Sequence, residues 1–252
     1  MLYEFLLIYV ETFTFLNVFK YITFRTGLAF FTSLFIALLI GGPFIKLFSN
    51  KKIFNPIRED GPSDHIVKKI GTPTMGGIII LIGIIFSVIL WADLSNIYIL
   101  FCLYIVASFG LLGAFDDYKK IRDTSSKGIS SRLKILIQLF LAVLGLIVLT
   151  YFIEYDEFNN LYFPFFKNLF VNLSWFFVPF SVFVIVGSSN AVNLTDGLDG
   201  LATVPVILVA GCFAFISYVT GNIVFSNYLQ ILYIEGAGEI SIFCGSIIGA
   251  CL

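Results

Sequence analysis

Two adjacent acids followed by lysines form the first group of residues that could do chemistry. Asp116 and Asp117 are followed by Lys119 and Lys120. Magnesium prefers oxygen ligands and binds through one or two carboxylates together with substrate phosphates, while cations hold the phosphate oxygens. The pattern therefore suits a magnesium–phosphate site. Two solvated acids at the membrane edge remain an equal alternative from these residues alone.

A second group lies in the segment 190–201, where Asn193, Asp196 and Asp199 are spaced three residues apart. This spacing would place the three side chains near one face of a helix, although Gly197 and Gly200 also allow an unwound stretch. A simpler interpretation makes Asp199 the N-cap of the next helix and leaves Asp196 solvated. That explains one acid only. Ionisable groups between apolar spans indicate a functional site.

A third segment, 71–77, reads Gly-Thr-Pro-Thr-Met-Gly-Gly. Thr72 suits an N-cap and Pro73 the first helical position, so the pattern predicts a helix start. The free N–H groups of such a start can bind an anion. A well-formed helix start without ligand is the alternative.

The elements that must position these groups are membrane helices. Hydrophobic residues make up 59% of the 252 positions and charged residues 12%, with a mean hydropathy of +0.99, whereas soluble domains have about 25% charged residues. The net charge of −1 gives no argument for nucleic acid. The single histidine, His65, excludes a site built from several histidines within this chain. The four cysteines lie in apolar runs, without metal or disulfide spacing.

Apolar runs of about 20 residues, the length that crosses a bilayer, predict an all-α, polytopic transmembrane bundle in one domain. The expected spans are 26–47, 74–92, 97–115, 133–153, 174–192 and 200–220, with a partial seventh at 240–252. We expect the chain to be a C-terminally incomplete piece of a longer protein. Residues 1–20 are expected to form an interfacial helix, and the loop 155–173 could hold a short hairpin.

Basic residues predict the orientation. Twelve of the fifteen lie in two loops, at 46–69 and 119–134, which fall on one side if the spans alternate. The positive-inside rule places that side in the cytoplasm and the N-terminus outside. Lys20 and Arg25 run against this assignment.

At these residues the sequence resembles the polyprenyl-phosphate N-acetylhexosamine-1-phosphate transferases, and among them the phospho-N-acetylmuramoyl-pentapeptide transferases. The segment 71–77 is the part typical of that branch, and the resemblance covers essentially the whole chain. The matching stretches are 17–25, 60–62, 71–77, 116–118, 190–202 and 237–239.

The resemblance implies an enzyme of the bacterial inner membrane that acts in peptidoglycan synthesis, with its active face cytoplasmic. It would move phospho-MurNAc-pentapeptide from UDP-MurNAc-pentapeptide to undecaprenyl phosphate, giving lipid I and UMP, with Mg²⁺ as cofactor. A homodimer is left open. We expect direct attack by the lipid phosphate, because a phosphate monoester is already mostly dianionic at pH 7.

The resemblance also implies roles for individual residues. The catalytic set is Asp116, Asp117, Asn193 and Asp196, and the metal ligands among them are Asp116, Asp117 and Asp196. The substrate contacts are Lys69, Thr74, Lys120, Gly197, Leu198 and Asp199.

One departure from the family pattern concerns segments that the family carries after its seventh span, a Met-Gly-Asp motif and a late His-rich loop. Neither occurs here, so we expect residues 1–252 to be inactive by themselves. Two other functions stay open. One is a related transferase that uses UDP-GlcNAc, and the other is an ion-coupled transporter whose unwound helix would hold the ion.

Overall fold

The computed structural model describes residues 2–50, 75–123, 128–153, 156–163, 166, 169–195 and 201–252, which are mostly helical. The elements in chain order are α1 (Leu2–Ile8), η1 (Thr14–Lys20), α2 (Ile22–Asn50), α4 (Gly77–Trp91), α5 (Ile97–Arg122), α6 (Ser131–Phe152), η2 (Asp156–Asn159), β1 (Asn160–Tyr162), β2 (Phe170–Asn172), η3 (Ser174–Phe176), α7 (Phe177–Thr195), α8 (Thr203–Thr220), α9 (Ile223–Leu229), η4 (Ala237–Glu239) and α10 (Ile240–Cys251).

The predicted fold class, an all-α polytopic membrane protein, is confirmed. Within the described residues, five helices are long and apolar enough to cross a membrane, and two shorter apolar helices cover Gly77–Trp91 and Ala237–Cys251. Large apolar side chains such as Leu39, Phe140 and Phe183 point away from the protein and are exposed. Such a surface is stable in hydrocarbon, where helices satisfy their own backbone hydrogen bonds.

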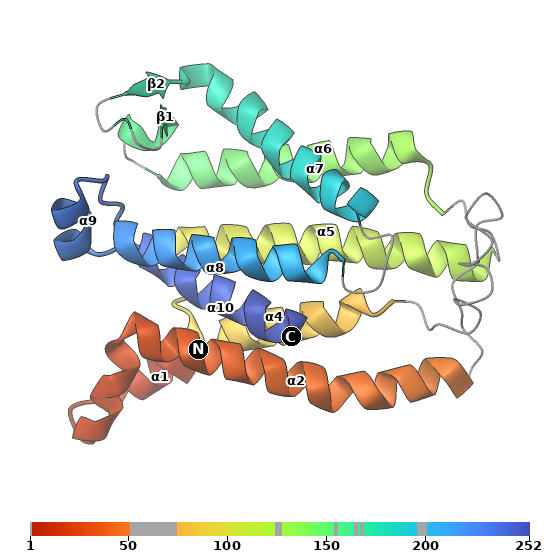
Figure 1. The fold of residues 1–252 in the computed structure, drawn as a ribbon, viewed down its shortest axis with the longest axis horizontal. Helices are drawn as coiled ribbons and strands as arrows, with labels where there is room; N and C mark the ends of the chain where they lie inside the picture. The colour runs from red at the N-terminus through yellow and green to blue at the C-terminus, as the bar shows by residue number, and fades with distance from the viewer. Residues whose placement is uncertain are drawn as a thin grey trace.

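The helices pack as two groups joined through α5, which lies between them in Figure 1. In one group α2, α4 and α10 share a core with the start of α5, with Ala29, Val88 and Ile242 at its centre. In the other, α6 and α7 pack through residues such as Leu146 and Val182. The helix α8 lies against α10.

Glycines bring α10 and α2 unusually close. A Cβ at Gly245 would lie 3.0 Å from the carbonyl oxygen of Thr26, and one at Gly249 would collide with the carbonyl of Phe30. Gly245 and Gly249 are four residues apart, on one face of α10, which is the small-residue spacing that lets membrane helices pack by direct backbone contact. The pair α2–α10 is therefore a fixed part of the bundle.

The bundle has two different ends (Figure 1). We call one the hairpin end, because it carries α9, η4 and the hairpin β1–β2, in which Leu161 pairs with Val171. The hairpin anticipated in the loop 155–173 is thus present. We call the other the site end, where α5 ends at Arg122, α6 begins at Ser131 and α7 ends at Thr195.

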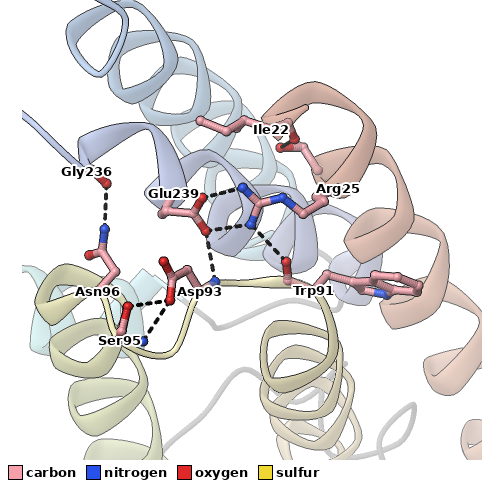
Figure 2. Close-up of polar contacts among 9 residues, drawn as sticks. Ile22, Arg25, Trp91, Asp93, Ser95, Asn96, Gly236 and Glu239 are labelled. Atoms are coloured by element: carbon pink, nitrogen blue, oxygen red, sulfur yellow. Dashed lines mark hydrogen bonds and ion pairs between the residues drawn. The ribbon is translucent and has the colours of Figure 1, made fainter. Parts of the chain in front are cut away.

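A buried ion pair lies at the hairpin end and joins several elements there (Figure 2). The guanidinium of Arg25 on α2 donates to both carboxylate oxygens of Glu239, one of them at 2.9 Å, and also to the carbonyl of Trp91 at 3.2 Å. The backbone N–H of Asp93 donates to Glu239 at 2.9 Å. Arg25 is 2% exposed and Glu239 8%, so the cluster ties α2, the α4–α5 turn and the start of α10 together inside the protein.

The ring of Tyr3 on α1 covers this pair, with its centroid 3.9 Å from the Arg25 guanidinium carbon. Burial raises the pKa of the Tyr3 phenol above its ordinary value, against the lowering effect of the nearby guanidinium. The phenol is therefore neutral at physiological pH, and the ring contributes a cation–π contact. This contact holds α1 against the bundle.

Several predicted boundaries differ from the observed ones; for example, α2 runs from Ile22 to Asn50 where the sequence predicts 26–47, and α7 ends at Thr195 where it predicts 192. The second predicted span begins at 74, but Met75 has φ +68 and α4 starts at Gly77. The third ends at 115, yet α5 continues to Arg122, because polar residues end the membrane segment without ending the helix. Residues 2–20 form two short pieces, α1 and η1, in place of one interfacial helix.

Candidate functional site

A cavity of about 450 Å³ opens at the site end between α4, α5 and α7. Asp117 of α5 and Asn193 of α7 both line it, and Met75 and Gly77 contribute the start of α4. The three segments that the sequence singles out therefore reach one cavity, from parts of the chain that are far apart.

Glycines keep this cavity open. A Cβ at Gly77 or at Gly113, which also lines the cavity, would meet nothing within 4 Å. Their missing side chains leave space that larger residues would fill. Ser189 on α7 adds a hydroxyl to the lining, a contribution that its place in an apolar run does not reveal.

The helix α5 gives the two adjacent acids different surroundings. Successive residues on a helix are about 100° apart, since 3.6 residues make one turn. Asp117 lines the cavity and its side chain is 35% exposed. Asp116 is not among the lining residues and its side chain is 10% exposed. Of these two acids, Asp117 is the one that can meet a ligand in the cavity.

Lys120 bridges the two carboxylates from one turn further along α5. Its Nζ lies 2.8 Å from Oδ2 of Asp116 and 3.0 Å from Oδ1 of Asp117. The lysine compensates one of two negative charges, so the cluster keeps a net charge of about −1. Such a cluster can bind a cation, and the lysine can then turn to an anion.

The turn before α6 holds the second oxygen of Asp116. The backbone N–H of Ile129 donates to Oδ1 of Asp116 at 2.7 Å. Asp116 is thus hydrogen-bonded at both oxygens, by a lysine and by a loop. Neither Gly128 nor Ile129 was singled out from the sequence, where the only signal was a glycine before a polar helix start.

A polar contact fixes α7 beside α6. The amide of Asn190 donates to the side-chain oxygen of Gln138 at 2.8 Å, and Gln138 is 3% exposed. Interhelical amide bonds of this kind help to set the rotation of membrane helices. The contact places α7 so that Asn193, almost one turn later, reaches the cavity. A single glutamine inside the apolar run 133–153 was the available signal.

The remaining predicted site residues lie outside the described residues. They are Lys69, Thr74, Asp196, Gly197, Leu198 and Asp199. The structure therefore brings together Asp117 and Asn193 in one cavity, with Lys120 and Asp116 directly beside it, and leaves the other six assignments as predictions.

The described donors fit a magnesium ion that takes its other oxygen ligands from water and from a phosphate. Among the residues that the structure describes, no three His, Cys, Asp or Glu side chains form a metal-binding group. Magnesium is usually held by one or two carboxylates while water and substrate phosphate supply the other oxygens. Asp117 offers such a carboxylate, and Asn193 an amide oxygen, at the cavity wall.

Known proteins with related sequences place the chain in a family. The family model described as glycosyl transferase family 4 matches residues 97–252. The phospho-N-acetylmuramoyl-pentapeptide-transferase of Pelagibacter ubique is 67% identical over all 252 residues, which cover 70% of that protein. The proteins of the same name from Rickettsia bellii and Bartonella quintana are 48% and 49% identical, over 100% and 93% of this chain and 70% and 65% of their own lengths.

Proposed function

The chain belongs to the phospho-N-acetylmuramoyl-pentapeptide-transferase family, and from that premise we propose that the cavity between α4, α5 and α7 is its active site. The reaction transfers phospho-N-acetylmuramoyl-pentapeptide to a lipid carrier in the bacterial membrane, as a step of peptidoglycan synthesis. The donor we propose is UDP-MurNAc-pentapeptide, the acceptor undecaprenyl phosphate, and the products lipid I and UMP.

The observation that carries this proposal is the shared cavity of Asp117 and Asn193. Phosphoryl transfer depends mainly on positioning and on neutralising charge. The cavity offers a carboxylate, an amide and a nearby lysine, and its walls are opened by glycines. It lies at the end of membrane helices, so one reactant can arrive from water and the other from lipid.

The reaction is a displacement at the phosphorus that carries the sugar. An oxygen of the lipid phosphate forms a new P–O bond to that phosphorus. The bond from the same phosphorus to the bridging oxygen breaks, and UMP leaves with the electron pair. Because the lipid phosphate is mostly dianionic at pH 7, no side chain has to remove a proton before the attack.

Magnesium, when bound, would neutralise charge on the diphosphate and polarise the phosphorus that is attacked. Asp117 and Asn193 would supply oxygen ligands to it, and Asp196 and Asp116 remain metal-ligand candidates from the sequence. Lys120, whose Nζ lies 3.0 Å from Asp117 in the structure, would supply a positive charge to a phosphate oxygen of the substrate.

We propose that the site end faces the cytoplasm, where the nucleotide donor is made. The two basic loops support this orientation. Arg25, which runs against it in the sequence, is buried and paired with Glu239, so it contributes little free positive charge to the hairpin end. An alkaline phosphatase fused after Asp123 should therefore be inactive in bacteria, and one fused after Tyr228 active.

The decisive experiment measures UMP release from UDP-MurNAc-pentapeptide by purified protein with undecaprenyl phosphate in detergent. Residues 1–252 are assayed alone and as a chimera, in which they are joined to the part of the Pelagibacter ubique relative that lies outside the matched region. We expect the chimera to release UMP only when Mg²⁺ is present, and chelation followed by Mg²⁺ addition to restore the rate.

The competing functions predict other outcomes. A related transferase would turn over UDP-GlcNAc faster than UDP-MurNAc-pentapeptide in the same assay. An ion-coupled transporter would release no UMP with either donor. A folded chimera, judged by a cooperative melting transition, that leaves UDP-MurNAc-pentapeptide intact would refute the proposed function.

A further inference from the structure

We propose that Gly128 is a positioning residue for the active site, because its backbone shape brings the N–H of Ile129 to Asp116. The inference rests on the proposed function and adds to it a residue that contacts no substrate. Through Asp116 and Lys120, this turn would set the carboxylate of Asp117 in the cavity.

The first observation is the backbone of Gly128. Its φ of +52° lies in the left-handed region, which residues other than glycine adopt rarely. The second is the space around it. A Cβ at Gly128 would collide with Oδ1 of Asp116 and lie 2.9 Å from Cε of Lys120. Glycine is therefore required at this position both by conformation and by close approach.

The third observation is the contact that this shape allows. Ile129 is 7% exposed, so its side chain anchors the turn in the protein, and its N–H donates to Oδ1 of Asp116 at 2.7 Å. With Oδ1 occupied in this way, Oδ2 is left for Lys120 at 2.8 Å. Lys120 in turn reaches Asp117 at 3.0 Å.

These contacts form a chain from the loop to the cavity. Without the turn, Asp116 would lose its backbone donor and rotate, and Lys120 would follow it. A displacement of about 1 Å in a positioned group can reduce a rate about 100-fold. The structure thus assigns Gly128 a role in turnover that acts through Asp116.

The test compares Gly128→Ala and Gly128→Asn with the unchanged chimera. Alanine adds both backbone strain and the collision, whereas asparagine tolerates the left-handed region and adds only the collision. Both variants should lose about 10-fold to 100-fold in kcat, with KM for the nucleotide donor nearly unchanged. Gly42→Ala on α2, where a Cβ would meet nothing within 4 Å, is the control and should keep the full rate.

Two further measurements separate positioning from a general loss of structure. If Gly128 acts through Asp116, the double variant Gly128→Ala/Asp116→Asn should be no slower than Asp116→Asn alone, because coupled residues are not additive. The rate at which acetic anhydride modifies Lys120, read by mass spectrometry without any turnover, should rise in both Gly128 variants and stay unchanged in Gly42→Ala.

Full activity in both Gly128 variants, additive losses in the double variant, or unchanged Lys120 modification would each overturn the proposal. If the chimera without substitutions releases no UMP, the proposed function is refuted. The rate of Lys120 modification would still decide the role of Gly128.

Discussion

The two ends of the bundle each carry a cluster of acidic and basic side chains, one Glu with an Arg at the hairpin end and two Asp with a Lys at the site end, and the two clusters serve different purposes. At the hairpin end, the fork of Arg25 meets both oxygens of Glu239, and both side chains are buried. At the site end, Lys120 makes single contacts to Asp116 and Asp117, whose side chains are 10% and 35% exposed, beside a cavity of about 450 Å³. The comparison separates charge that the protein satisfies internally from charge left available to a ligand.

The chemistry of the two bases agrees with this division. Arginine presents a planar, always charged fork that suits a fixed bidentate contact, while lysine is a flexible point charge that can change partners. The Arg25 contacts join α2, α4 and α10, the group that glycines already hold together. We infer that the hairpin end supports the fold and the site end carries the reaction.

The largest effect is expected at the hairpin end. Arg25→Met leaves Glu239 buried without its cation, and breaking a buried pair on one side costs about 3–5 kcal/mol. The free energy of unfolding, measured by denaturant titration in detergent micelles, should fall by that amount.

A matched double variant sharpens this expectation. Arg25→Met/Glu239→Met removes both charges, and replacing a whole buried pair by apolar residues is often close to neutral. The double variant should regain most of the lost stability. If it is as unstable as Arg25→Met, the ion pair itself is needed for the fold.

The next effect is expected at the site end and in turnover only. Asp117→Asn removes the carboxylate that reaches the cavity, so UMP release by the chimera should fall at least about 100-fold, a typical loss for a group that stabilises transition-state charge. The unfolding free energy should stay nearly the same, because this side chain is partly exposed and Lys120 keeps its ion pair with Asp116.

Asp123→Asn is the matched control, since it makes the same change at the exposed C-cap of α5. It should leave UMP release and stability unaltered. A large loss of stability in Asp117→Asn, or an equal loss of activity in Asp123→Asn, would remove the distinction between the two ends.

The smallest effect is expected between them, where Gln138 accepts a hydrogen bond from Asn190. Gln138→Leu keeps an apolar helix and removes one interhelical bond, for which about 0.6 kcal/mol is an average value and about 1.7 kcal/mol an upper one. The unfolding free energy should fall within that range. The change in KM for UDP-MurNAc-pentapeptide can be converted to a free energy. If that free energy is larger than the loss of unfolding free energy, this contact serves the cavity directly.

The sequence by itself determined that this protein lies in a lipid bilayer, and it determined most of the helices. Hydropathy along the chain depends on local composition, and a bilayer accepts almost only helices from such runs, so the apolar core of each helix could be predicted. The helix boundaries were less certain. Hydropathy marks where the membrane segment ends, and α5 continues beyond that point as far as Arg122.

Only the tertiary structure decided which charges pair and which remain available. The local sequence around Arg25 does not show that its partner is Glu239, which is 214 residues away. Local sequence also does not show that Asp117, and not its neighbour Asp116, lines the cavity. Both facts depend on the rotation and height of one helix against another. Long-range contacts such as the close packing at Gly249 and the bond of Asn190 to Gln138 contribute to these positions, and no property of a single segment contains them.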